Sequence, residues 1–238
     1  MITKKHKIVA GLFITIGGLL NVTRMIPVFA GIEKLPEFPL KRAQQLADFI
    51  APNYGGHLIS HLMAMVGFVF LLFGVLYLVD TYKKYKYPIF TRIFAIAGIG
   101  GLTLFFLAAI VDGFVVPEAL RFFIEYGDSR APLVEITHHL AISLYSTALF
   151  LLFISIGFNS QIILHTNEFK KRLGYFGLFV GHFTAVAFLL GLFGYFWEKP
   201  LGGLFIMLSN FYWVILGVSV MRKKVVETTS TSDESAVI

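Results

Sequence analysis

Long apolar runs dominate this chain and restrict it to folds that a lipid bilayer can host. Six runs approach or exceed the roughly 20 residues that a helix needs to cross the hydrocarbon core. These runs are residues 8–29, 57–79, 89–116, 135–158, 173–197 and 201–221. Because backbone polar groups in lipid must be satisfied internally, they predict an all-α, polytopic bundle of six transmembrane helices, built as one domain over residues 1–224.

The composition supports a membrane location and narrows the chemistry. Only 14% of the 238 residues are charged, whereas soluble domains carry about 25%. The chain has no cysteine, which excludes disulfides and zinc–thiolate sites. The net charge of +6 does not indicate nucleic-acid binding, because the basic residues gather beside apolar runs, as an anionic leaflet favours. The expected partner is the lipid bilayer.

Clusters of lysine and arginine predict the orientation of the chain. The clusters lie at residues 4–7, 83–86, 170–172 and 222–224. With six spans, all four fall on one side of the membrane, whereas the two longer loops opposite mix acidic and basic residues. We therefore expect a multi-pass protein of the cell membrane with both termini in the cytoplasm. The polar residues 225–238 are expected to form a disordered cytoplasmic tail.

A cleaved signal peptide is the alternative for the first run. The basic start fits it, and the sequence Val28-Phe29-Ala30 has small residues, Val28 and Ala30, where a peptidase would require them. However, Asn21 and Arg24 interrupt the stretch, and the run is long for the apolar region of a signal peptide. The pattern therefore favours a retained first span.

Two amphipathic segments fall in the outer loops, at Glu37–Ala51 and Glu118–Tyr126. Both interleave large apolar side chains with charged ones, which is typical of helices lying on a membrane surface. Two alternatives stay open for them: plain loop helices, or a lid over an outward-facing cavity.

Ionisable residues within the spans are the candidate functional residues, since burying them in a bilayer is costly. A helical rise of about 1.5 Å per residue converts sequence offsets into depths. The deeper group, about 24–28 Å above the cytoplasmic ends of the spans, is His61, His139 and Arg24, and the interfacial group, about 33–35 Å up, is His57, Glu135 and Asp112. These depths predict a site that opens outward.

Two histidines of the second span, His57 and His61, are four residues apart. This spacing puts both rings on one helix face, where they can share one metal ion. The structural alternative is that His57 is only a residue at the start of a helix, in the headgroup region.

The fourth span begins with an acid and two adjacent histidines, Glu135, His138 and His139. The Glu-x-x-His spacing is the one by which helical bundles hold di-iron or di-manganese centres. Because His138 and His139 point about 100° apart, we expect one of them as a ligand and the other as a hydrogen-bonding partner. The alternative is a first helical turn in which the helix dipole favours an acid.

Asp112 and Arg24 complete the outward group. Asp112 is expected either to complete a metal shell, to pair with Arg24, or to be an interfacial acid before Pro117. Arg24 is expected either to neutralise a carboxylate or haem propionate, or to extend to the outer headgroups.

His182 lies apart from this group, near the middle of the fifth span. It follows Gly177-x-x-x-Gly181, a signature of close helix packing. We expect it to hydrogen-bond across the bundle to Asn210 or Ser209 rather than to bind a cofactor.

Parts of this pattern resemble two families. His61 with His138 or His139 resembles the layout of six-helix b-type cytochromes, which bind haem between histidines of the second and fourth spans; the third span here has no histidine to pair with His182. His57-x-x-x-His61 and Glu135-x-x-His138-His139 resemble the histidine boxes of membrane fatty-acid desaturases and hydroxylases. That family has more histidines and keeps them on the cytoplasmic side.

The pattern predicts a membrane redox protein that holds haem b or a non-haem metal (iron, copper or zinc) near its outer face. The expected haem site is His61, His138, His139 and Arg24, and the expected metal ligands come from His57, His61, Asp112, Glu135, His138 and His139. A quinone or another lipophilic small molecule is a candidate partner. The alternative is a non-enzymatic transporter, sensor or immunity-type protein with these residues lining an outer vestibule. The sequence has no Walker loop, Gly-x-Ser-x-Gly elbow or dinucleotide fingerprint, and it leaves any catalytic residues unassigned.

Overall fold

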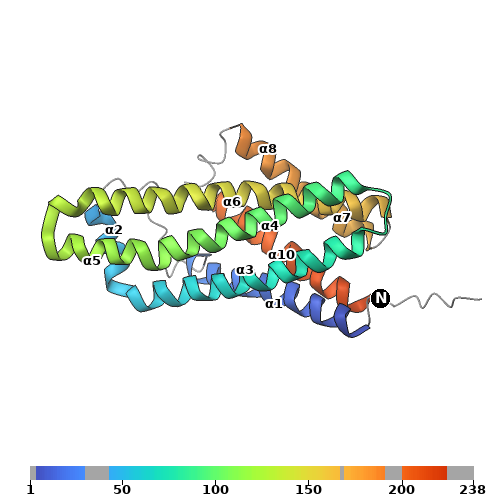
Figure 1. Cartoon of the computed structure of the whole chain (residues 1–238), viewed down its shortest axis with the longest axis horizontal. Coiled ribbons are helices and arrows are strands. Elements are labelled where there is room, and N and C mark those ends of the chain that lie inside the picture. The colour runs from blue at the N-terminus through green and yellow to red at the C-terminus, as the bar shows by residue number, and fades with distance from the viewer. Residues whose placement is uncertain (1–3, 30–42, 167–168, 191–199, 224–238) are drawn as a thin grey trace, which may run out of the picture.

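The computed structural model describes residues 4–29, 43–166, 169–190 and 200–223 (Figure 1). Of these residues 95% are helical, so the expected all-α class is confirmed. Four described stretches are long and apolar enough to cross a membrane: Ala43–Tyr82, Pro88–Thr166, Lys171–Leu189 and Gly203–Arg222. The second of them contains two long helices, which run side by side in Figure 1.

A long helical hairpin forms the centre of the molecule. Its first arm joins α4 (Pro88–Ile110), the π-helical segment η2 (Val111–Val115) and α5 (Val116–Tyr126) into one rod. Its second arm is α6 (Ala131–Thr166), reached through the 3₁₀ turn η3 (Gly127–Arg130). At about 1.5 Å per residue, each arm is roughly 55 Å long, whereas a hydrocarbon core is about 30 Å thick. The hairpin is therefore long enough to project beyond a membrane.

Three helices pack beside this hairpin: α1 (Lys4–Phe29), α3 (Tyr54–Tyr82) and α10 (Pro200–Arg222). α3 lies between α4 and α1, and α1 contacts α10 on its other side. Small residues bring these backbones together: a Cβ on Gly17 would lie 2.7 Å from the carbonyl oxygen of Gly67, and one on Gly217 as close to that of Gly11. Such close backbone contact is the usual way in which helices associate in lipid.

A further helical rod packs on the C-terminal half of α6. It consists of α7 (Lys171–Leu178), a second π-helical segment η4 (Phe179–Phe183) and α8 (Thr184–Leu189). A Cβ on Gly181 would lie 2.4 Å from the backbone nitrogen of Gly157 on α6. The expected role of the Gly177-x-x-x-Gly181 pattern in helix packing is thus confirmed.

The end of the hairpin has a small hydrophobic core of its own. The short helix α2 (Ala43–Ile50), followed by the 3₁₀ turn η1 (Ala51–Asn53), lies against α5 and α6. This core contains Ala43, Leu46, Ala47, Ile50, Val116, Ala119, Leu120, Phe123 and Val134. Most apolar residues of α2 and α5 therefore contact protein, and α5 extends the axis of α4, whereas Phe49 and Ile124 stay exposed.

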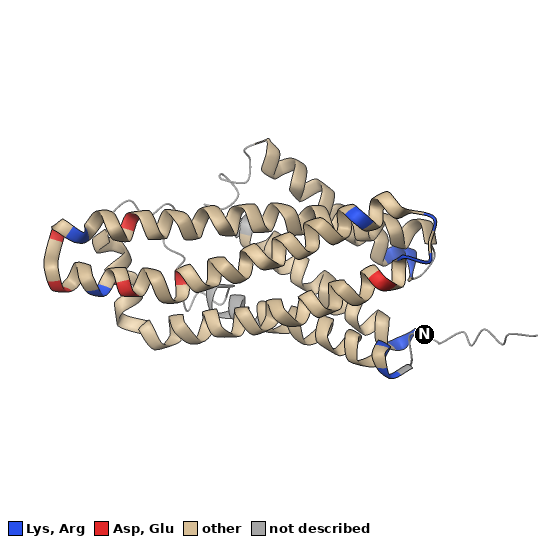
Figure 2. Ribbon diagram, in the orientation of Figure 1, with Lys and Arg blue, Asp and Glu red and all other residues tan. Residues whose placement is uncertain are grey.

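Charge separates the two ends of the bundle. Figure 2 shows lysines and arginines at the end where α1 begins and α3 meets α4, and a mixture of acidic and basic residues at the turn between α5 and α6. All six predicted spans begin, and five of them end, at residues within described helices. Residues 191–199, which complete the predicted fifth span, lie outside the described residues, as do residues 37–42 of the first amphipathic segment and the tail 225–238.

Candidate metal centre

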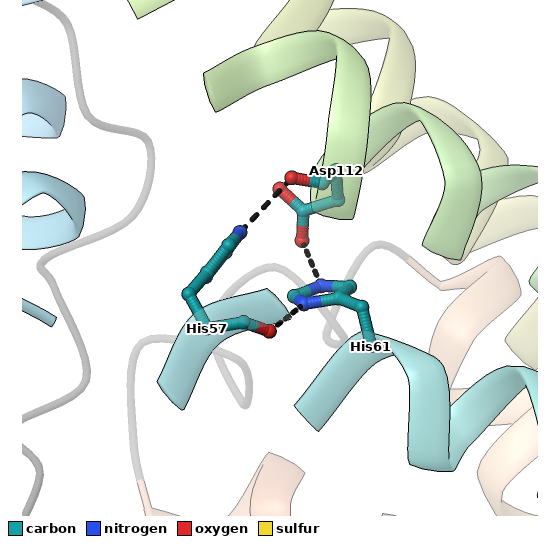
Figure 3. Close-up of polar contacts among 3 residues, drawn as sticks. All are labelled: His57, His61 and Asp112. Carbon is teal, nitrogen blue, oxygen red and sulfur yellow. Dashed lines mark hydrogen bonds and ion pairs between the residues drawn. The ribbon is translucent and has the colours of Figure 1, made fainter. Parts of the chain in front are cut away.

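Three of the predicted ligands converge where α3 begins and η2 interrupts the first hairpin arm. The side chains of His57, His61 and Asp112 each offer a ligand atom, and these atoms lie within 4.8 Å of one another. His57 and His61 come from one helix face, with ring centroids 4.3 Å apart, and Asp112 reaches them from η2 (Figure 3). The two histidines share one helix face, as their i, i+4 spacing predicts, and the side chain of Asp112, for which the sequence leaves three roles open, lies beside His61.

The π-helical register of η2 explains how Asp112 is presented. The backbone N–H of Val116 donates to the carbonyl of Val111, five residues back, instead of to that of Asp112. The next residue, Pro117, has no N–H to donate. The Asp112 carbonyl instead accepts a hydrogen bond from His57 Nε2, at 2.9 Å. The interrupted helix thus turns both the carbonyl and the carboxylate of Asp112 toward α3.

His61 is the best-oriented residue of the group. Its side chain is 4% exposed, and that of Asp112 is 20% exposed. Its Nδ1–H donates to the carbonyl of His57 at 2.8 Å, and its Nε2 lies 2.9 Å from Asp112 Oδ2. A histidine that binds a metal nearly always donates its other ring N–H to a carbonyl or carboxylate, which fixes the ring and makes the free nitrogen a better ligand. His61 has this arrangement.

The backbone of η2 is packed tightly on the His61 ring. A Cβ on Gly113 would lie 2.7 Å from His61 Cβ and 3.0 Å from its Cγ. Only glycine lets the two helices approach this closely. The space beside His61 on this side is therefore filled by η2.

The other predicted site residues lie outside the three-residue group. His138 on α6 is buried, at 5% exposure, and close enough to Asp112 to interact with its charge. His139 is exposed and Glu135 is partly buried. The predicted divergence of the two adjacent histidines is therefore confirmed, with only His138 facing inward. Arg24 falls within α1, but its side chain lies outside the described residues.

His182 forms a separate polar contact on η4, away from the metal centre. Its Nε2 lies 2.7 Å from Gln161 Nε2 on α6, so the Gln161 amide donates to it. The predicted partners Asn210 and Ser209 are wrong: both side chains donate to the carbonyl of Ile206, within α10. Gln161 lies one helical turn after Gly157, against which the His182 ring packs.

One polar network was not predicted from the sequence. The Tyr82 hydroxyl donates to Asn159 Oδ1 at 2.7 Å, and Asn159 Nδ2 donates to the Tyr212 hydroxyl at 2.6 Å. Ser160 Oγ lies 3.1 Å from the same hydroxyl. These four residues are fully buried and join α3, α6 and α10. Asn159 within a long apolar stretch was the available signal, since polar groups inside a membrane bundle hydrogen-bond between helices.

Comparison with protein families, with curated proteins and with solved structures gave no match, so the function has to be argued from the site itself.

Proposed function

We propose that this chain is a six-span membrane protein that binds a non-haem transition-metal ion near its outer face. The proposed ligands are His57, His61 and Asp112. The observation that carries the proposal is the His61 ring, which is held by the His57 carbonyl with its second nitrogen aimed at Asp112. Two imidazoles and one carboxylate with open positions are the ligand set of non-haem iron(II) oxygenases and also occur in catalytic zinc sites.

The distances suit a bound ion after small movements. Metal–ligand bonds to histidine nitrogen and carboxylate oxygen are about 2.0–2.2 Å, so neighbouring ligand atoms around one ion lie roughly 3 Å apart. The His61 Nε2–Asp112 Oδ2 distance of 2.9 Å is already in this range. His57 would exchange its hydrogen bond with the Asp112 carbonyl for the ion.

A non-haem ion fits the geometry better than haem b. Haem ligation by His61 and His138 or His139 would require a porphyrin beside the His61 ring. That space is occupied by Gly113, and the His61 nitrogen that would bind iron is in contact with Asp112. The contact of Asp112 with His61 favours a single ion between α3 and η2.

The proposed orientation places this site outside. The basic end of the bundle would face the cytoplasm, with both termini there. Asp112 lies 24 residues along the rod that begins at Pro88, a rise of about 36 Å. This exceeds the roughly 30 Å of hydrocarbon and puts the metal at the level of the outer headgroups.

The test is metal analysis of the protein purified in detergent, with its visible spectrum recorded on the same sample. We expect about one equivalent of a transition metal in the wild type, no Soret band, and at least a tenfold loss of affinity in His61→Gln and in Asp112→Asn. The matched control is His139→Gln, an exposed histidine on α6, which should keep its metal.

A well-folded protein that takes up no iron, copper or zinc would refute the proposal. That result would favour the alternative, in which the polar residues line the outer vestibule of a non-enzymatic transporter or sensor.

A further inference from the structure

An apolar groove begins within one helical turn of the metal centre. It lies between α3 and α4, has a volume of about 360 Å³, and is lined by Leu62, Met65, Val66, Val69, Phe70 and Phe106. Leu62 directly follows His61. Met65 lies four residues after His61, on the same face of α3. Ligand pockets typically have volumes of about 300–1,000 Å³.

The depth of the groove matches that of a lipid chain. Phe106 lies six residues before Asp112 on the first hairpin arm, or about 9 Å nearer the basic end. The groove therefore occupies the outer half of the proposed hydrocarbon layer, while the metal ligands lie at headgroup level. Its exposed surface is almost wholly apolar, with Leu62 and Val66 respectively 44% and 48% exposed.

The charge of the proposed metal centre favours a ligand with an anionic headgroup. Two neutral imidazoles and one carboxylate would leave a divalent ion with a net charge of +1. Such an ion attracts an anionic oxygen ligand, and the 20% exposure of the Asp112 side chain leaves the site partly open. A phosphate group on a lipid supplies that oxygen at the right depth.

We propose that the ligand of this centre is a phospholipid of the outer leaflet, with its phosphate on the metal ion and one acyl chain in the groove below. The inference rests on the proposed metal site and adds the class of molecule that the site receives.

The test uses nanodiscs that contain phosphatidylglycerol with a photoactivatable diazirine on one acyl chain. After irradiation, labelled peptides are mapped by mass spectrometry, and bound metal is measured on the same samples. We expect the groove residues to be labelled at least threefold more than the peptide around Ile96, which is 74% exposed on α4. Removal of the metal with a chelator should lower groove labelling to the level of that reference peptide.

Two variants separate the groove from the general lipid surface. Val66→Trp fills the groove and should lower its labelling at least threefold while metal is still bound. Ile96→Trp, which adds the same side chain to an exposed position outside the groove, should change neither quantity.

The outcomes distinguish the two proposals. Even labelling of both surfaces in a metal-loaded protein would overturn the lipid inference and leave the metal site standing, as would crosslinking of the groove to a second copy of the chain. Absence of bound metal would overturn both, whatever the labelling pattern.

Discussion

At the scale of single residues, Asp112 contributes both a backbone carbonyl and a side-chain carboxylate to the candidate metal site. Its carbonyl and its carboxylate bind two different histidines of α3, and both contacts depend on the shifted register of η2. Asp112 and the two histidines could be selected from the sequence, because ionisable groups at matching depths are unusual in a span. The π-helical turn was not predicted, although Pro117 stands five residues after Asp112, where it cannot donate the i→i+5 hydrogen bond of that register.

Gly113 offers a test of this arrangement. Gly113→Ala should push η2 away from α3, because the new methyl group would meet His61 Cβ, which cannot rotate away. We expect destabilisation of about 1–3 kcal/mol and a metal affinity lowered roughly tenfold, as for changes that disturb ligand orientation. Both are measured by titration of purified protein with metal and by denaturant unfolding.

The control for this prediction is Gly100→Ala on the same arm, where the added Cβ would meet only Leu151 Cδ1 at an ordinary 3.6 Å. It should keep its affinity and be neutral or slightly stabilised, since alanine favours a helix over glycine. Equal behaviour of the two variants would contradict the proposed packing of η2 on His61.

At the scale of elements, the two π-helical segments carry Asp112 and His182, both predicted from the sequence as unusual polar residues. Such segments occur frequently at functional sites because they widen the helix and free backbone groups. The amphipathic segments were predicted correctly as helices over their described residues. The protein surface that their apolar residues contact was not predicted. Amphipathicity shows that one face is covered, and only the neighbouring helices decide whether lipid or protein covers it.

The buried network between α3, α6 and α10 predicts a stability effect. Asn159→Leu keeps the size of the side chain but leaves the Tyr82 and Tyr212 hydroxyls without their amide partner. Each buried group left unsatisfied costs about 1–3 kcal/mol, so the free energy of unfolding in detergent should fall by at least that amount. Thr147→Val removes an exposed hydroxyl bonded to the Ser143 carbonyl on the same helix and should have little effect. A comparable loss in both variants would show that the network is not stabilising.

At the scale of the whole molecule, one axis organises the structure. The basic end, the apolar middle and the end with mixed charge follow each other along the hairpin (Figure 2). The end where α2, α5 and α6 share a hydrophobic core begins just past the three proposed metal ligands. Because this core has its own apolar contacts, it can hold η2, and with it the proposed ligand Asp112, in place.

Topology reporters test this axis. Fusions at Tyr85, between α3 and α4, and at Gly127, between α5 and α6, should report opposite sides of the membrane, with Tyr85 in the cytoplasm. The reason is that lysines flank Tyr85, whereas mixed charges flank Gly127. The measurement compares a reporter that is active only in the cytoplasm with one that is active only outside it. The same side for both sites would contradict the depth assigned to the metal centre.

The sequence by itself determined the helical class, the helices long and apolar enough to cross a membrane, and the candidate functional residues, because apolar run length and the cost of buried charge are properties of local composition. Tertiary structure alone decided which of those residues meet. His57, His61 and Asp112 are joined across helices, His138 faces inward while its neighbour His139 does not, and His182 finds Gln161 instead of the partners expected in α10. These choices depend on helix rotation and on one shift of register at η2, both of which involve contacts between helices that are distant in the sequence, such as that of Gly113 with His61.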